Sequence, residues 1–415
     1  MFFKNSIKKI LNSKVCRKIG ISLINYDMLK YTKHYLWIFN FRKIPTLKII
    51  FNKAKDVTEE DISICQRLIS AYRLATLDRA RIENNTSQLW SEGIKMHCGR
   101  LIPAMESGSA QGLARILAFM FREDFVYGLA SGSLVENAHS CIGAKIWSLK
   151  YQDNLIALAE YLGVVRNESS QQGARGYGLK EGLDTVVAKI EEAIGIPMDF
   201  PDIGSPYGVK ANNSLITMEH PEHLYVALRI SHVVRDYLKH KEKQLLNLVE
   251  IGAGFGGLAY WTIKLKKINL GTYTIIDLPL INVLQGYFLM KAFGSSKVSL
   301  YGEVLNKDAM ISILPAFAFQ AEIKNDIDML INENSMPEMS KTIVENYIQL
   351  AKKKVSGLFF SYNHEAYSIV YGKPQVLVPE IISRIGGFCL LSRNASWMRN
   401  GYVEETYRCV ENSKD

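Results

Sequence analysis

The sequence predicts an α/β fold in which a largely parallel sheet occupies the C-terminal part of the chain and a mostly helical region precedes it. Two observations predict the parallel sheet. The apolar run 248–251 leads through a glycine-rich turn into a helical stretch, and the β-branched run 271–277 follows as a second strand. A third observation concerns the end of the sheet. The strand-like runs 387–392 and 402–410 are joined by a segment that contains Asn400-Gly401, a hairpin signal, and they predict an antiparallel pair.

The chain divides into three predicted parts. Residues 1–55 form a basic amphipathic segment, residues 56–240 a helical cap over the site that binds the substrate, and residues 241–415 the domain that holds the sheet. Within the cap, Thr58 and Asp61 approximate a capping box ahead of an apolar stripe, which predicts the start of a helix. With 415 residues and a hydrophobic content of 48%, the chain is long enough for two or three domains.

The excess positive charge of the chain lies in its N-terminal segment. Residues 1–55 hold thirteen Lys or Arg and one acid, whereas the other 360 residues carry 37 bases and 40 acids. Apolar residues between Phe2 and Val15 lie near helical spacing among lysines, a pattern that favours a helix on an anionic membrane. A solvated basic tail, or a helix packed on the body, is the alternative. We do not expect nucleic acid as a partner, because the charge is confined to one segment and no nucleic-acid motif accompanies it.

The cysteines and the hydrophobic runs predict a cytoplasmic protein, with peripheral contact at the inner face of the membrane as a further hypothesis. The six cysteines show no CxxC pair and no metal-ligand spacing, which is typical of reduced thiols. No run approaches the roughly 18 apolar residues of a membrane span, and we expect no signal peptide. His220-Pro-Glu-His223 is a poor metal site because it contains a proline and suggests no third ligand, so we expect no metal.

The glycine-rich turn indicates a nucleotide-cofactor site. Gly252, Gly254 and Gly256 lack the side chains that would keep a ligand away from the backbone, and the following helix points its positive end at the turn. Gly252, Gly254 and Gly257 also satisfy the GxGxxG spacing of NAD- and FAD-binding folds, so the glycines leave both cofactor classes open. Glu250 favours S-adenosylmethionine, because a carboxylate before the first glycine suits a cationic amino-acid end and would lie badly near a pyrophosphate.

Three further residues are predicted to bind the cofactor. Asp277 ends the second strand, where an acid can accept hydrogen bonds from ribose hydroxyls, and Leu278 follows it. Both cofactor families use an acid at this place, and Asp277 has an alternative role as a helix N-cap. Glu303 follows a third predicted strand and would meet the adenine edge, an assignment based on position alone.

Three segments together resemble the sugar O-methyltransferases of bacterial surface-polysaccharide clusters. They are Glu250–Gly257, Ile275–Pro279 with Leu284–Tyr287, and Leu330–Met339. The first motif is shared by all class I methyltransferases, whereas the Asn-Ser-x-x-Glu-Met run in the third is more specific. The resemblance covers about residues 245 to 370. It implies a Rossmann-like class I methyltransferase sheet, parallel with an antiparallel C-terminal strand, S-adenosyl-L-methionine as donor, and a hydroxyl of a glycan or nucleotide sugar as acceptor.

The catalytic candidates follow the fourth and fifth predicted strands. Because carbohydrate hydroxyls are very weak acids, methyl transfer to them calls for a base with a pKa near ambient pH, such as His364 at the end of its strand. Asn332 ends the fourth strand, and Glu338 on the following turn can orient or activate a sugar hydroxyl. The alternatives are that His364 satisfies a loop or binds substrate without proton transfer, and that Glu338 caps the helix that begins near Ser340.

The sequence therefore predicts an S-adenosylmethionine-dependent O-methyltransferase that acts on a sugar hydroxyl in the biosynthesis of O-antigen or capsule. Two other classes stay open. A nicotinamide-dependent oxidoreductase would use the same glycines and Asp277, and a catalytically silent scaffold of a polysaccharide-synthesis complex would keep the fold without the reaction.

Overall fold

The computed structural model describes residues 47–410 apart from 54, 78, 127–128, 131–141, 167–180, 240–243, 305, 324–325, 366–368 and 371–372. The chain forms two compact units, each built from segments that are far apart in the sequence. Unit 1 comprises residues 1–54 and 119–222, and unit 2 comprises residues 55–118 and 223–415. Most of the predicted basic segment lies outside the described residues, and the predicted three-part division of the chain stays a prediction.

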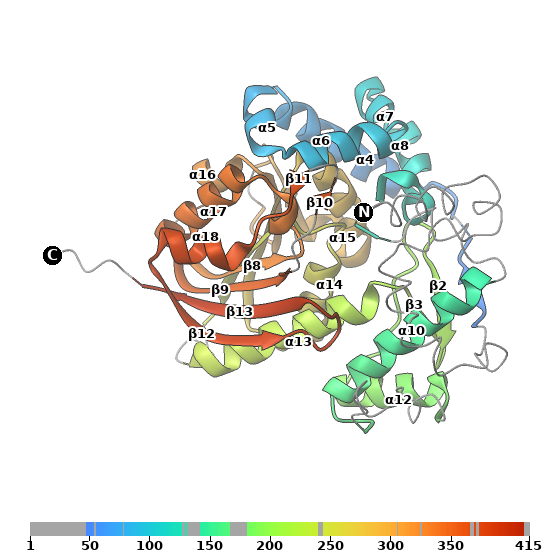
Figure 1. Cartoon of the computed structure of the whole chain (residues 1–415). Coiled ribbons are helices and arrows are strands. Elements are labelled where there is room, and N and C mark those ends of the chain that lie inside the picture. The colour runs from blue at the N-terminus through green and yellow to red at the C-terminus, as the bar shows by residue number, and fades with distance from the viewer. Residues whose placement is uncertain are drawn as a thin grey trace, which may run out of the picture. The chain divides into compact units, whose positions relative to one another are not determined.

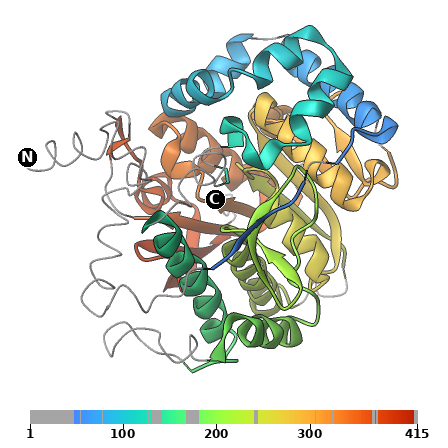
Figure 2. The ribbon, with the colours of Figure 1, turned by 90° about the vertical axis from the view of Figure 1, so that its right-hand side faces the viewer.

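Unit 1 contains a small antiparallel sheet, which has three strands among its described residues, in the order β1-β2-β3. Figure 2 shows β1, in blue, beside the green strands β2 and β3. Asn212 and Asn213 join β2 to β3 with φ of 46° and 66°, the left-handed conformation that a two-residue hairpin turn favours. The elements are β1 (Ile49–Phe51), η3 (Met120–Arg122), η4 (Asp124–Val126), α10 (Ile142–Tyr161), α12 (Leu183–Ile194), β2 (Tyr207–Ala211) and β3 (Ser214–Ile216).

Unit 2 contains the main sheet, which has eight strands in the described part of the chain, in the order β12-β13-β9-β8-β4-β5-β7-β6. Figure 1 shows β12, β13, β9 and β8 of this sheet side by side. β13 is antiparallel to its neighbours β9 and β12, and the other neighbouring pairs are parallel. The strands are β4 (Leu246–Ile251), β5 (Leu270–Asp277), β6 (Val298–Leu300), β7 (Ile311–Pro315), β8 (Ile327–Glu333), β9 (Val355–His364), β12 (Phe388–Ala395) and β13 (Tyr402–Cys409). The predicted fold class, a largely parallel sheet with an antiparallel C-terminal strand and a helical region before it, is confirmed.

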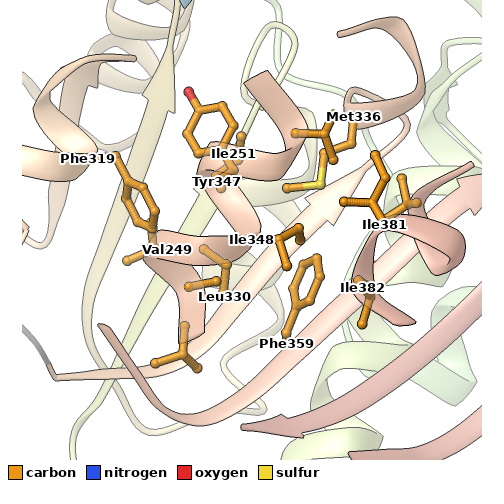
Figure 3. Close-up of a cluster of buried hydrophobic side chains, with 14 of the residues drawn as sticks. Val249, Ile251, Phe319, Leu330, Met336, Tyr347, Ile348, Phe359, Ile381 and Ile382 are labelled. Atoms are coloured by element: carbon orange, nitrogen blue, oxygen red, sulfur yellow. The ribbon is translucent and has the colours of Figure 1, made fainter. Parts of the chain in front are cut away.

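Helices cover this sheet and bury its apolar side chains. Figure 3 shows the core in which α17 and α18 pack on strand residues such as Val249, Ile251 and Leu330. Because side chains alternate along a strand, Glu250 points to the opposite face from Val249 and Ile251. The elements are α13 (His220–Tyr237), α14 (Gly257–Leu265), α15 (Pro279–Phe293), η6 (Ser295–Lys297), α16 (Ala318–Ala321), η7 (Met336–Glu338), α17 (Lys341–Lys354), β10 (Ile369–Val370), β11 (Lys373–Pro374) and α18 (Val378–Ile385).

The helical segment of unit 2 is tied to the sheet by α4. These helices are α4 (Glu59–Ala75), α5 (Arg79–Asn85), α6 (Gln88–His97), α7 (Leu101–Ser107) and α8 (Ala110–Leu117). The predicted capping box of Thr58 and Asp61 is present at the start of α4. Further along α4, the guanidinium of Arg67 donates to both carboxylate oxygens of Glu303, at 2.7 Å each, and to the carbonyl oxygen of Val298. No helix among the described residues is long and apolar enough to cross a bilayer.

Candidate active site

The glycine-rich turn connects β4 to α14. Gly252, Gly254 and Gly256 have φ of 72°, 57° and 96°, in the left-handed region that favours glycine. A Cβ on Gly252 would lie 2.2 Å from Ser335 Oγ, so a close approach of the β8–η7 loop requires glycine there. A Cβ on Gly254 would meet no atom within 4 Å. Gly254 therefore presents accessible backbone next to the N-terminus of α14, where a ligand can approach.

Glu250 is a buried carboxyl group on the strand that leads into this turn. Glu250 is 1% exposed, and its Oε2 accepts a hydrogen bond from the hydroxyl of Tyr273 at 2.8 Å. Burial raises the pKa of Glu250 to about 8, the negative charge of Asp277 raises it as well, and the Tyr273 hydrogen bond opposes the rise. A cation beside such a carboxyl group stabilises its ionised form, because the cation offsets the free-energy cost of a buried negative charge.

Asp277 lies at the carboxyl end of β5, the neighbour of β4. Its Oδ1 accepts from the amide of Leu278 at 2.7 Å and its Oδ2 from the side-chain amide of Gln285 at 2.6 Å. Burial raises the pKa of Asp277 to about 7, and hydrogen bonds from Leu278, Gln285 and the Ala253 amide oppose the rise. The hydrogen bond from Ala253 joins Asp277 directly to the glycine turn. Leu278, predicted to bind the cofactor, is the N-cap of α15 and thereby fixes the orientation of Asp277.

Gln285 clamps this arrangement together, a role that the sequence alone did not suggest. Gln285 is fully buried on α15, and its Nε2 donates both to Asp277 and to the carbonyl oxygen of Gly254 at 2.9 Å. Its Oε1 accepts from Asn282 at 2.9 Å. The hydrogen bonds of Gln285 thus hold the glycine turn and Asp277, the last residue of β5, in one geometry. The Leu284–Tyr287 segment of the resemblance contains this residue.

The residues of this turn fit a cofactor that is cationic at one end and carries ribose hydroxyls. Accessible backbone at Gly254 provides the cradle, and Asp277 is an acceptor for hydroxyl groups. Glu250 supplies negative charge once a cation beside it favours its ionised form, because burial and Asp277 raise its pKa in the ligand-free protein. A pyrophosphate would bring further negative charge toward two carboxyl groups whose pKa values are already raised.

Asn332 is placed at the carboxyl end of β8, as predicted, but its amide serves the protein itself. Asn332 is fully buried, and its Nδ2 donates to the carbonyl oxygen of Ile251 at 2.9 Å. Its Oδ1 accepts from the Met336 amide at 3.3 Å and from Asn363 Nδ2 at 3.0 Å. These bonds tie the ends of β4, β8 and β9 together. The geometry is that of a supporting residue, and a direct catalytic role for Asn332 stays a prediction.

Glu338 lies on η7, two residues after Met336, and is partly buried. Its backbone amide donates to Ser335 O at 3.1 Å. Burial raises the pKa of the Glu338 carboxyl group to about 7, while a hydrogen bond from the side chain of Trp90 and the positive charge of Arg399 oppose the rise. The helix α17 is capped by Ser340, whose Oγ accepts from Ile343 N, so the alternative of Glu338 as helix cap is not what the structure has.

His364 is the last residue of β9 and is partly exposed. It pairs with Tyr402 across the antiparallel contact to β13, and the two rings meet edge to face with centroids 5.7 Å apart. The turn between β12 and β13 also contacts the Tyr402 ring. There the guanidinium of Arg399 lies over the Tyr402 ring, 4.0 Å from its centroid. His364 and Tyr402 thus meet at the carboxyl end of β9, and Arg399 lies over Tyr402 and also acts on Glu338 with its positive charge.

Comparison with known proteins adds a structural likeness at low identity. No family model matches the sequence, and no curated protein matches it. The chain is similar to the 1,6-didemethyltoxoflavin-N1-methyltransferase of Burkholderia thailandensis at 13% identity, with 46% of this chain and 79% of that chain covered and a TM-score of 0.33. It is similar to the magnesium protoporphyrin IX methyltransferase of Synechocystis at 12% identity, with 46% and 81% covered and a TM-score of 0.32. An S-adenosylmethionine dependent methyltransferase of Mesorhizobium loti shares 12%, with 40% and 92% covered and a TM-score of 0.28. These values are too low to carry a conclusion about the reaction or the substrate.

Glu303, which was predicted to meet the adenine, lies apart from the other predicted cofactor-binding residues, Glu250 and Asp277. It follows β6, which is at the edge of the sheet, and β7 rather than β6 is the neighbour of β5. Both of its carboxylate oxygens bind Arg67, and the same bonds hold the pKa of Glu303 below its usual value although burial acts against them. The structure thus gives Glu303 a partner in the helical segment, and contact with adenine stays a prediction. Pro315 ends β7 and pairs with Asp277 in the sheet.

Proposed function

We propose that this chain is an S-adenosylmethionine-dependent O-methyltransferase that acts on a sugar hydroxyl in the biosynthesis of a bacterial surface polysaccharide. The observation that carries the proposal is the pair of Glu250 and Asp277 beside a turn whose backbone is accessible at Gly254. Two buried carboxyl groups with raised pKa values favour a cationic ligand over an anionic one. For this reason we prefer the methyl donor to a dinucleotide.

Each side chain has a defined task in the proposed reaction. S-Adenosylmethionine supplies a methyl group on an electrophilic sulfonium. Glu250 balances the positive charge of the donor, and Asp277 accepts hydrogen bonds from its ribose. At the neighbouring strand ends, His364 takes the proton of the acceptor hydroxyl, and Glu338 orients that hydroxyl.

The surroundings of Glu338 and His364 support a sugar as acceptor. Sugars present hydroxyl groups at their rims and apolar C–H faces, so sites for them combine carboxyl groups with aromatic rings. Trp90 and Tyr402 supply rings beside Glu338 and His364, respectively. The resemblance of residues 330–339 to sugar O-methyltransferases points in the same direction.

The acceptor can be tested on the glycan itself. Mass spectrometry of the surface polysaccharide from cells that lack this gene should show one residue lighter by the mass of a methylene group. The purified chain with labelled donor should restore the label to that glycan. Donor binding without any transfer would favour the silent scaffold, and binding of NAD with turnover would favour the oxidoreductase.

We further propose that residues 1–55 bring the protein to an anionic membrane, where lipid-linked acceptors are found. Thirteen bases against one acid in this segment support the proposal, although residues 1–46 lie outside the described structure. The full chain should sediment with vesicles that contain phosphatidylglycerol and should remain free with neutral phosphatidylcholine vesicles. Equal sedimentation of a chain that lacks residues 1–50 would contradict this.

A further inference from the structure

We infer that Asn363 binds the acceptor through its side-chain oxygen, Oδ1, and so helps to determine which acceptor is methylated. Asn363 is 4% exposed and directly precedes His364, which is partly exposed at the end of β9. Its Oδ1 is closed to solvent and has no hydrogen-bond partner in the part of the chain that the structure describes. The inference rests on the proposed function and adds to it a residue that recognises the acceptor.

Backbone groups fix how the amide of Asn363 is turned. The carbonyl oxygen of Ile251 can only accept, and it receives a hydrogen bond from Asn332 Nδ2 at 2.9 Å. The amide of Met336 can only donate, and it donates to Asn332 Oδ1 at 3.3 Å. Asn332 therefore presents its oxygen to Asn363, and Asn363 must donate from its own Nδ2, at 3.0 Å. The same Nδ2 donates to Ser361 Oγ at 2.8 Å, so Oδ1 is the atom of the amide that is turned away from both partners.

The unpaired oxygen lowers the stability of the ligand-free protein. Nearly all buried polar groups in folded proteins have a hydrogen-bond partner, because a group that loses water on folding and gains no partner destabilises the fold. The neighbouring amide of Asn332 is bonded at both of its ends, whereas Asn363 uses its Nδ2 alone. A bound molecule with an O–H or N–H group completes the hydrogen bonds of Asn363, and this requirement defines the chemistry of the ligand.

A hydroxyl group of a sugar meets this requirement. An amide oxygen accepts a hydrogen bond but takes up no proton near neutral pH, so the partner of Asn363 is a hydroxyl that neighbours the one to be methylated. Because side chains alternate along a strand, Asn363 and His364 reach the end of β9 from opposite faces and can contact different groups of one acceptor. An acceptor without the second hydroxyl leaves Oδ1 unpaired and should be rejected.

The hydrogen bonds of Asn332 connect this oxygen to the predicted donor site. Ile251, whose carbonyl oxygen binds Asn332 Nδ2, directly precedes Gly252 of the glycine-rich turn. Ser335 Oγ donates to the same carbonyl oxygen at 2.9 Å. The side-chain amides of Asn332 and Asn363 therefore link the turn to the end of β9. Such a fixed connection favours methyl transfer, because the reaction needs the acceptor oxygen in line with the methyl group.

Kinetics with the unmethylated polysaccharide test this assignment. The polysaccharide is isolated from cells that lack the gene, and transfer from labelled S-adenosylmethionine is measured for the wild type and Asn363→Leu. Leucine has a similar shape but neither accepts nor donates, so kcat/KM for the polysaccharide should fall about tenfold or more, while the Kd of S-adenosylhomocysteine stays the same. Asn346→Leu, on the exposed side of α17, is the matched control and should change neither. An unchanged kcat/KM in Asn363→Leu would overturn the inference.

Thermal unfolding separates acceptor binding from a purely structural role. Asn332→Leu leaves the buried Met336 amide without its acceptor and should lower the Tm. Asn363→Leu loses the bonds of Nδ2 but also removes an unpaired oxygen, so its Tm should fall less. Equal losses of Tm in the two variants would overturn the inference, because Asn363 would then serve the fold as Asn332 does.

A crystal structure of the full chain with S-adenosylhomocysteine and an oligosaccharide from the same polysaccharide shows the contact directly. We expect a hydroxyl oxygen of the oligosaccharide within about 3.2 Å of Asn363 Oδ1. A water molecule in that place in the complex would overturn the inference. A wild-type chain that transfers no methyl group to the polysaccharide would overturn the proposed function and this inference together, whereas transfer that Asn363→Leu leaves unchanged removes the inference alone.

Discussion

Among single residues, Glu250 should make the stability of the ligand-free protein depend on pH. Burial raises its pKa from the usual 4.5 to about 8, so the carboxyl group ionises more readily in the unfolded chain than in the folded one. Its contribution to the free energy of unfolding is complete below about pH 4.5 and is lost as the pH rises through about 8. Urea unfolding at a series of pH values should show this loss.

The Glu250→Gln variant provides the comparison, because an amide does not titrate. Its free energy of unfolding should fall less than that of the wild type between about pH 5 and pH 8. Glu380→Gln removes one exposed carboxylate on α18 and should follow the wild-type curve. Parallel curves for Glu250→Gln and the wild type would show that Glu250 is ionised in the folded protein throughout this range.

His364 carries the proposed proton transfer. His364→Ala should lower kcat by roughly 10² or more and leave the affinity for S-adenosylhomocysteine unchanged, because a general base contributes to the chemical step and not to donor binding. Turnover with labelled donor and calorimetric titration measure the two quantities. His232→Ala, on α13, has no part in the proposed mechanism and is the control. A near-normal rate in His364→Ala would remove His364 as the base.

At the scale of elements, substitution of two glycines of the same turn should affect different properties, the stability of the fold for one and donor binding for the other. Gly252→Ala places a Cβ 2.2 Å from Ser335 Oγ and should destabilise the fold, whereas a Cβ at Gly254 meets no atom within 4 Å. Both positions have positive φ, which costs an alanine roughly 1–2 kcal/mol. Gly254→Ala should therefore fold with little further loss and instead weaken donor binding. Thermal unfolding and calorimetry separate the two effects, and equal losses of stability would contradict the assignment of free space at Gly254.

The attachment of α4 to the sheet is a second element-scale prediction. Arg67 donates to Glu303, Ser295 and Val298, and its side chain is 28% exposed. Arg67→Met should lower the free energy of unfolding by about 2 kcal/mol, since it leaves a partly buried carboxylate without its donor. Arg235→Met, which removes an exposed pair with Asp236, should cost about 0.5 kcal/mol or less. Similar losses in the two variants would contradict the tethering role.

The elements also show how far local sequence patterns reach. The strands around Glu250, Asn332 and His364 and the hairpin after residue 387 were predictable, because apolar runs and turn residues act within a few positions. The place of β7 beside β5 was not, because Tyr273 pairs with Ile311 through contacts that no short pattern encodes. For the same reason Glu303 looked like a ligand-binding acid, and its partner Arg67 was not foreseen.

At the scale of the whole molecule, the residues of the candidate site come together because parallel strands end at one edge of the sheet. That rule allowed His364 to be selected from the sequence, whereas Glu250 was selected because its charge suits a cationic cofactor next to the glycine turn. It could not supply Gln285 or Trp90, whose partners lie on other elements. Nor could it show that helices of residues 59–117 share a compact unit with the sheet, since contacts across long separations set that unit.

The measurement that tests the central claim most directly is calorimetric titration of the full chain with S-adenosylhomocysteine and, separately, with NAD. We expect saturable one-to-one binding of S-adenosylhomocysteine, no heat of binding with NAD, and a loss of affinity of about tenfold or more in both Glu250→Gln and Asp277→Ala. Binding of NAD in place of S-adenosylhomocysteine, or binding of S-adenosylhomocysteine that neither substitution weakens, would contradict a cofactor site built on these two carboxyl groups.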